Sequence, residues 1–300
     1  MVNYLCFHIG DDFKNISLEL TGIFKEIPGG NVKIPKGFSK VINCLSNKMP
    51  KNTIKFGKVV SAIYWEQPLS KVKVICEDEE YVADHTIVTC SLGYLKLHHN
   101  KLFKPPFPQN KMDAIENMGF GKVNKIFLYF EKPYWTKGKG GVKLAWNYTS
   151  NSFEESQWYT SIFAFDEVLN NPKVLVAWVH GKAAEYMETL PENNNIIKTC
   201  AFLLQSFLKD DTIPAPTKVK RSTWCSYPYT AGSYSYFGVQ SLSSDVKSLA
   251  EPLVLERRPI VCFAGEATSE QYFSTSHGAR SSGIREAERL INYYDSHSML

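Results

Sequence analysis

The C-terminal part of the chain contains the most specific set of residues that could bind a ligand. Residues 260–264 are an apolar run that predicts a buried strand, and this run leads directly into Gly265-Glu266. The stretch Phe273-Ser-Thr-Ser-His-Gly-Ala279 then opens a segment with helical periodicity. A strand that enters a helix across a short loop brings backbone N–H groups and the positive end of the helix dipole to one point. That point suits an anionic ligand, with Glu266 accepting hydrogen bonds from ligand hydroxyls, and the simpler alternative is a Ser/Thr helix cap.

A second candidate is a lysine among apolar residues on a predicted strand. Residues 123–130 read as a strand, and a period of two places Lys125 on one face with Val123, Phe127 and Tyr129. Burial on that face would lower the pKa of the amine, because a low-dielectric environment disfavours its charged form. Such a lysine could hold a water or exchange a proton near neutral pH. The alternative is a lysine whose stem packs on the strand edge while its amine reaches water.

The third candidate is a segment rich in aromatic rings around a glycine turn, Trp224-Cys-Ser-Tyr-Pro-Tyr-Thr-Ala-Gly-Ser-Tyr-Ser-Tyr236. Rings of this kind can simply pack a core. They can also surround an alkylammonium ion, with each contact contributing about 0.5–2 kcal/mol. The segment is therefore a candidate cage for a cationic ligand.

The elements that position these residues alternate between short β-rich runs and amphipathic segments, which predicts an α/β (α+β) fold with two interleaved regions. The expected strands are residues 53–56, 59–65, 72–76, 81–82, 85–89, 123–130, 146–148, 159–165, 174–179 and 260–264. The expected helices are residues 38–49, 112–118, 183–190, 196–208 and 278–294. The four runs between residues 53 and 82 should form a small antiparallel sheet, and His98-His99 are expected in a surface loop.

Composition narrows the class of protein. With 300 residues, 44% of them hydrophobic, the chain can bury a large core. The net charge of +4 arises from 34 basic and 30 acidic residues spread along the chain, so no basic block indicates nucleic acid or a membrane surface. The 7 cysteines lack a C-x-x-C pair and are expected to be reduced thiols, and no metal site is expected. No apolar run reaches the length of about 18 residues that crosses a bilayer.

The tail resembles the C-terminal FAD-binding signature of the flavin-containing amine oxidases, above all the spermine and N1-acetylpolyamine oxidases. The resemblance extends over nearly the whole chain, because further motifs of these polyamine oxidases follow in the same order. They are Ile27-Pro-Gly, Ile34-Pro-x-Gly-Phe38, Gly57-Lys-Val-Val60 with Ile63-x-Trp65, and Ile87-Val-Thr-Cys-Ser-Leu-Gly-Tyr-Leu-Lys96.

The resemblance implies a role for individual residues. Lys125 matches the lysine that contacts flavin N5 through a water, and is the expected catalytic residue. Tyr234 and Thr275 are expected to flank the substrate amine. The residues expected to line FAD are Val60, Thr89, Trp224, Glu266, Thr275 and Ser276, with Glu266 on the ribityl chain.

The resemblance also implies an architecture, a partial Rossmann-like FAD/NAD(P)-binding layer interleaved with a mixed-sheet substrate domain. The expected segments are substrate-domain helices at 1–50, a β segment of the FAD domain at 51–96, the substrate-binding domain at 97–220 and the C-terminal FAD-binding segment at 221–300. A dinucleotide-binding fold also needs a G-x-G-x-x-G loop after its first strand. The sequence has only Gly119-x-Gly121 and Gly138-x-Gly140, and neither is expected between a strand and a helix. Family members are longer and carry this loop near their N-terminus, so the chain is expected to begin after it.

The expected reaction is FAD-dependent oxidation of spermine, spermidine or their N1-acetyl derivatives to an aldehyde, a shorter amine and H2O2, with O2 as the oxidant. Two alternatives stay open: a truncated remnant or incomplete gene product that cannot retain FAD, and a relative of the histone lysine demethylases. The expected partners are a small polyamine and O2, without nucleic acid or membrane, and the oligomeric state is open. Ser298-Met299-Leu300 resembles a weak peroxisomal signal, so the expected location is the cytoplasm or the peroxisome.

Overall fold

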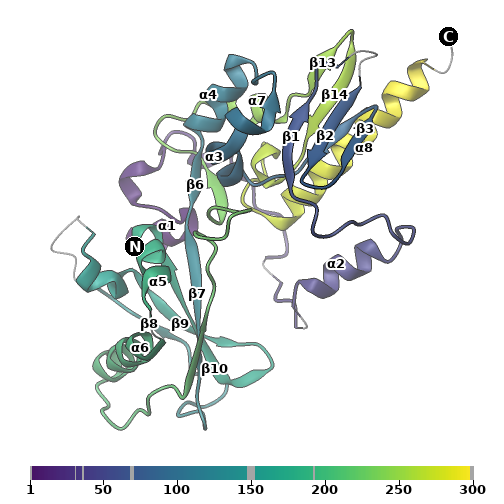
Figure 1. Ribbon diagram of the computed structural model, residues 1–300. Coiled ribbons are helices and arrows are strands. Elements are labelled where there is room, and N and C mark those ends of the chain that lie inside the picture. The colour runs from purple at the N-terminus through teal and green to yellow at the C-terminus, as the bar shows by residue number, and fades with distance from the viewer. Residues whose placement is uncertain are drawn as a thin grey trace. The chain divides into compact units, whose positions relative to one another are not determined.

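The computed structural model describes residues 2–30, 32–35, 37–67, 71–146, 153–191 and 193–297. It has the mixed α/β fold that the sequence predicts, and the chain divides into two compact units (Figure 1). Unit 1 comprises Met1–Leu18, Ser91–Gly93 and Gly119–Val239, and unit 2 comprises Glu19–Cys90, Tyr94–Met118 and Gln240–Leu300. Each unit thus combines segments that lie far apart in the sequence, and the predicted interleaving of two regions is confirmed.

The core of unit 1 is an antiparallel five-stranded sheet with the order β11-β7-β10-β9-β8. Its strands are β7 (Val123–Tyr129), β8 (Val142–Lys143), β9 (Ala164–Val168), β10 (Asn171–His180) and β11 (Lys218–Arg221). Alternate residues of β7 are buried, and Ile126 and Leu128 are completely enclosed in the hydrophobic core. The face that carries Lys125 is half-buried.

Helices complete unit 1, and they include α1 (Val2–Ile9), α5 (Gly181–Thr189) and α6 (Asn193–Leu208), with 3-10 helices at Phe13–Asn15 and Glu155–Ser161. In α6, Ile196, Cys200, Leu203 and Leu204 recur at the helical period and are buried in the same core as the sheet.

Strands β6 (Gly119–Gly121) and β12 (Tyr234–Tyr236) of unit 1 form a two-stranded antiparallel ribbon. The two glycines of β6 allow close contacts, one with an aromatic ring and the other with backbone. A Cβ atom on Gly119 would lie 2.4 Å from the ring of Tyr236, and one on Gly121 would lie 2.0 Å from the carbonyl oxygen of Ile9. This glycine pair therefore has a packing role, and it lies outside a strand-to-helix turn, as the sequence predicts.

Unit 2 contains two sheets. The first has the order β3-β2-β1-β5 and consists of β1 (Val60–Tyr64), β2 (Val72–Cys76), β3 (Glu80–Ala83) and β5 (Phe103–Lys104). The antiparallel pairing of β1, β2 and β3 confirms the small sheet predicted there. The second has the order β13-β14-β4 and consists of β4 (Thr86–Val88), β13 (Leu253–Leu255) and β14 (Arg258–Phe263).

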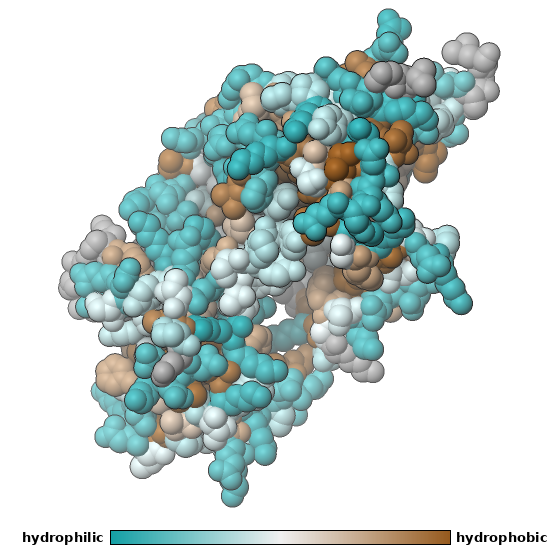
Figure 2. Space-filling model, viewed as in Figure 1, coloured by the Kyte–Doolittle hydropathy of each residue, from teal (hydrophilic) through white to brown (hydrophobic). Residues whose placement is uncertain are grey.

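The helices of unit 2 are α2 (Ser39–Ser46), most of α3 (Leu92–Leu102), α4 (Gln109–Asn117), α7 (Asp245–Ala250) and α8 (Ser276–His297). Helix α4 packs on α7, and the long α8 runs beside β14 (Figure 1). The apolar face of α2 is not buried within the described structure, because Phe38, Ile42 and Leu45 are each about half exposed. Figure 2 shows such apolar side chains at the surface around α2 and beside β1–β3.

Several sequence-based expectations are wrong in detail. Residues 53–56 form no strand, and the strand expected at 159–165 is a 3-10 helix up to Ser161 followed by β9. His98 and His99 lie in α3 and not in a loop, and His99 is only 3% exposed, with its ring parallel to that of Phe107. The strand expected at 146–148 falls partly outside the described residues, and Trp146 is in no strand. No helix in the described ranges is long and apolar enough to span a membrane.

Candidate functional site

The ends of two parallel strands in unit 2 bring together two of the expected ligand-binding residues. Strands β4 and β14 are parallel with Val88 opposite Phe263, and the N–H of Ala264 donates to the carbonyl of Val88 at 3.0 Å. Thr89 and Glu266 follow the ends of these strands and therefore lie at the same edge of the sheet. In open α/β sheets, ligands bind outside the carboxyl ends of parallel strands.

The turn after β14 presents the Glu266 carboxylate. Gly265 has a φ of 130°, a conformation that favours glycine, and the 3-10 helix η5 (Glu266–Thr268) follows at once. Glu266 is half-buried, and its Oε2 atom accepts the N–H of Ser274 at 2.5 Å. The carboxylate thus connects the turn to the loop that precedes α8.

The start of α8 is capped within the chain, as in the simpler of the two interpretations of this segment. The Thr275 hydroxyl accepts the N–H of Gly278 at 3.0 Å and donates to the carbonyl of Tyr272 at 2.6 Å. Ser276 is the first residue of the helix and is exposed. A Cβ atom on Gly278 would lie 1.9 Å from the Tyr272 oxygen, so this glycine allows the start of α8 to approach the chain's own backbone closely.

Lys125 in unit 1 has the environment that its sequence position predicts. It lies on β7, and burial lowers the pKa of its amine. Directly opposite on β10 is Trp178, whose ring centroid is 4.4 Å from the Lys125 Nζ atom. In the part of the chain that the structure describes, the Lys125 amine has no ion pair with a carboxylate. Trp178 could not be recognised from the sequence, because the register of two strands about fifty residues apart is a tertiary property.

Further aromatic residues surround this lysine and tryptophan. The ring of Phe7 on α1 lies 5.0 Å from that of Trp178 and 4.6 Å from that of Phe163. The hydroxyl of Tyr234 donates to the carbonyl of Phe7 at 2.9 Å, and burial raises the pKa of Tyr234 above its ordinary value. The aromatic cluster of unit 1 thus includes residues from four separate stretches of the chain, of which the sequence indicated only Tyr234.

A buried amide fixes the segment that contains Trp224. Asn124, next to Lys125 and fully buried, accepts the N–H of Trp224 at 3.1 Å and the hydroxyl of Ser222 at 2.9 Å. Its amide donates to Glu188 on α5 at 2.5 Å, and Glu188 also accepts the N–H groups of residues 225 and 226, each at 2.8 Å. Trp224 is 47% exposed, although its backbone is anchored in this way.

The predicted site residues are divided between the two units. Unit 1 contains Lys125, Trp224 and Tyr234, and unit 2 contains Val60, Thr89, Glu266, Thr275 and Ser276. Val60 is the first residue of β1, opposite Cys76, in the other sheet of unit 2.

The chemical groups in both units fit a flavin. A half-buried amine without a carboxylate partner can donate to a ring nitrogen or hold a water against it. A carboxylate at the carboxyl end of parallel strands can accept hydrogen bonds from the hydroxyls of a ribityl chain. We find no cluster of three or more His, Cys, Asp or Glu side chains with metal-binding geometry within the described residues.

Comparison with known proteins identifies the class. The family model "Flavin containing amine oxidoreductase" matches residues 16–291, and the chain belongs to this family. Flavin is therefore the cofactor of the family, in agreement with the expected FAD.

Several members of this family, and one solved structure, are similar to most of the chain. The chain is 36% identical over 299 residues to the peroxisomal N(1)-acetyl-spermine/spermidine oxidase of Homo sapiens, covering 93% of this chain and 58% of that protein. It is 32% identical over 314 residues to polyamine oxidase 1 of Oryza sativa subsp. japonica, covering 95% of this chain and 61% of that one. Among solved structures, the cyclohexylamine oxidase from Brevibacterium oxydans has the same fold, with a TM-score of 0.72, 13% identity, and coverage of 98% of this chain and 64% of that one. The chain thus spans about three-fifths of the length of these relatives.

Proposed function

We propose that this protein oxidises polyamines, namely spermine, spermidine or their N1-acetyl derivatives, with FAD as cofactor and O2 as electron acceptor. The products would be an aldehyde, a shorter amine and H2O2. The observation that carries the proposal is the half-buried Lys125 amine, which lies over Trp178 and forms no ion pair with a carboxylate of the described residues. The chain matches the flavin-containing amine oxidoreductases from residue 16 to 291. The polyamine class is supported by the names of the human and rice relatives.

Each expected residue has a definable task. When bound, FAD supplies the acceptor for the hydride that leaves the carbon next to the amine nitrogen. Lys125 would hold a water at its Nζ atom and exchange a proton there, since the lowered pKa brings the amine closer to neutral pH. Glu266 would accept hydrogen bonds from ribityl hydroxyls, while Thr89 and Ser276 would line the cofactor.

The remaining residues would bind and orient. Tyr234 and Thr275 would flank the substrate amine with a ring and a methyl group, because their hydroxyls already form hydrogen bonds within the chain. Trp224 and Val60 would contribute apolar surface that excludes water from the cofactor.

The partners would be a small polyamine and O2. The location would be the cytoplasm or the peroxisome, and the name of the human relative, a peroxisomal oxidase, supports the peroxisome. The proposed signal Ser298-Met299-Leu300 lies outside the described residues. The alternative, a family member that cannot retain FAD, is separated from the proposal by the following experiment.

The purified chain is supplied with FAD and desalted, its visible absorbance is recorded, and H2O2 release is measured with spermine, spermidine and N1-acetylspermine. We expect a flavin band and peroxide release that falls about 100-fold in Lys125→Met, which keeps the length of the stem and removes the amine. Lys132→Met, which changes an exposed lysine shortly after the same strand, serves as the matched control. A colourless protein without peroxide release supports the alternative, and equal rates in the two variants contradict the role of Lys125.

A further inference from the structure

We infer that Arg285 and Glu286 on α8 are positioning residues that hold the Gly265–Thr268 turn and thereby place the Glu266 carboxylate for the cofactor. The last step rests on the proposed function, in which Glu266 binds the ribityl chain of FAD. Both residues belong to the segment Ser282-Gly-Ile-Arg-Glu-Ala287, to which the proposed function gives no role.

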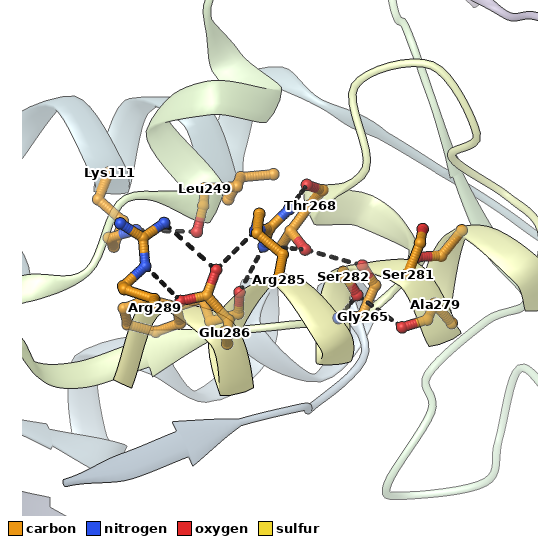
Figure 3. Close-up of polar contacts among 12 residues, drawn as sticks. Lys111, Leu249, Gly265, Thr268, Ala279, Ser281, Ser282, Arg285, Glu286 and Arg289 are labelled. Carbon is orange, nitrogen blue, oxygen red and sulfur yellow. Dashed lines mark hydrogen bonds and ion pairs between the residues drawn. The ribbon is translucent and has the colours of Figure 1, made fainter. Parts of the chain in front are cut away.

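Arg285 connects the two ends of the turn. Its Nη1 atom donates to the carbonyl of Thr268 at 2.7 Å, and its Nη2 atom donates to the carbonyl of Phe263 at 2.8 Å and to the Thr268 hydroxyl at 3.1 Å (Figure 3). Phe263 is the last residue of β14, and Thr268 is the last residue of η5. One planar guanidinium group thus fixes the separation between the strand end and the end of the turn that contains Glu266.

Glu286 orients that guanidinium. Its side chain is completely buried, and it accepts the Nε of Arg285 at 2.6 Å and the Nε of Arg289 at 2.7 Å (Figure 3). A buried carboxylate is tolerated only when it is paired and hydrogen-bonded, as Glu286 is here. Burial and the nearby Glu286 carboxylate raise the pKa of the Cys262 thiol to about 12, so the negative charge also acts on β14.

A third residue of the same helix face holds the start of the turn. The N–H of Gly265 donates to the Ser282 hydroxyl at 2.8 Å, and this hydroxyl donates to the carbonyl of Ala279 at 2.6 Å (Figure 3). Ser282, Arg285 and Glu286 are spaced by three and four residues, so they project from one side of α8. The turn is therefore attached to one rigid helix both at its first residue and at its last.

The geometry of arginine is essential to this arrangement. A lysine would keep the positive charge but could not reach two carbonyls and a carboxylate at fixed angles, because only guanidinium has a planar fork of donors. Arg289 provides the matched control, since it contacts the same Glu286 carboxylate one turn further along α8 and makes no hydrogen bond to the turn in the described structure.

The test compares Arg285→Lys and Glu286→Gln with Arg289→Lys in the full 300-residue chain. Hydrogen exchange is measured at the amides of Thr268 and Ser269, which donate to the carbonyls of residues 265 and 266, with the buried amides of α6 as internal reference. We expect exchange at the turn to be about tenfold faster in Arg285→Lys and Glu286→Gln, and within about threefold of wild type in Arg289→Lys. In a fluorescence titration with FAD, the dissociation constant should rise about tenfold in the first two variants only.

Exchange rates at the turn that match those of Arg289→Lys would overturn the positioning role. A loosened turn with unchanged FAD affinity would overturn its connection to the cofactor. The exchange comparison decides the positioning role even when the wild-type chain takes up no FAD, so failure of the proposed function is recognised separately. If Arg285→Lys does not fold, Glu286→Gln decides the positioning role in the same exchange measurement, because it weakens the hold on the guanidinium without removing Arg285.

Discussion

At the residue scale, two adjacent polar side chains of β7, Lys125 and Asn124, have different roles because their environments differ. Lys125 has a lowered pKa because it is half-buried against Trp178. Its neighbour Asn124 is fully buried, and both the nitrogen and the oxygen of its side-chain amide form hydrogen bonds. One strand therefore presents a half-buried amine with a lowered pKa on one face and a hydrogen-bonded anchor on the other.

Asn124 should contribute substantially to stability. In Asn124→Ala, the Trp224 N–H and the Glu188 carboxylate each lose a hydrogen-bond partner, so the free energy of unfolding should fall by about 3 kcal/mol in urea titrations. Asn195→Ala, in the exposed first turn of α6, should change it by less than about 0.5 kcal/mol. Equal effects of the two substitutions would show that the Asn124 network is not a stabilising element.

The burial of Lys111 should make the free energy of unfolding depend on pH. Its side chain is 3% exposed, its Nζ atom donates to the carbonyls of Ser248 and Leu249 at 2.6 and 2.9 Å, and burial lowers its pKa to about 7. Because the unfolded chain holds this proton up to a pKa of 10.5, the unfolded state binds more protons than the folded state between these two values. The contribution of Lys111 to the free energy of unfolding should therefore rise from pH 7 to pH 9.

This pH effect is isolated by comparing wild type with Lys111→Met. Between pH 7 and pH 9, the difference in unfolding free energy should move by about 2 kcal/mol in favour of wild type. Lys101→Met, which alters an exposed lysine near the end of α3, should show no such change. A difference for Lys111→Met that is independent of pH would contradict the lowered pKa.

At the element scale, local sequence patterns predicted elements with a clear periodicity, including the short strands β1–β4, but missed helix α3 and several two- or three-residue strands. The alternation in residues 123–130 and the helical period in residues 196–208 predicted β7 and α6, because each pattern buries one face. The short strands β6 and β12 are held by pairing with each other and by the glycine contacts around them, which no local pattern shows. In α2 the pattern predicted the helix but not the packing, since its apolar face is exposed in the described structure.

The sequence indicated some residues of the candidate site but not the residues that hold them in place. Motif similarity indicated Lys125 and Glu266, and the parallel pairing of β4 with β14 places Thr89 at the same edge as Glu266. Trp178 and Arg285 were not assigned a role, because their contacts depend on strand register and on the packing of α8. Residue type and spacing thus suggested the chemical groups, and tertiary contacts determine how those groups are held.

Two glycines of α8 should respond to alanine with opposite signs. A Cβ atom at Gly278 meets the backbone of Tyr272 at 1.9 Å, so Gly278→Ala should separate α8 from the preceding loop and destabilise the protein by about 1–3 kcal/mol. Gly283 has no atom within 4 Å of the same position, so Gly283→Ala should stabilise the helix by about 0.5–1 kcal/mol. Thermal unfolding midpoints measure both, and a Gly278→Ala variant as stable as Gly283→Ala would show that the close contact is absent in solution.

At the scale of the whole molecule, the chain builds two units from interleaved segments, and the residues with predicted roles fall in both. Unit 1 provides the amine of Lys125 within an aromatic cluster, and unit 2 provides the parallel-strand edge with Thr89 and Glu266. The division of the chain into functional segments at residues 50, 96 and 220 stays a prediction.

The central claim is that the edge formed by β4 and β14 binds FAD through Glu266. The most direct measurement is a titration of FAD, followed by flavin fluorescence, into the wild-type chain, Glu266→Gln and the exposed control Glu270→Gln. Our account predicts that wild type and Glu270→Gln bind FAD equally well, and that Glu266→Gln binds about tenfold more weakly because it loses a charged acceptor. Failure of the wild-type chain to bind FAD, or equal affinity of the two variants, would contradict it.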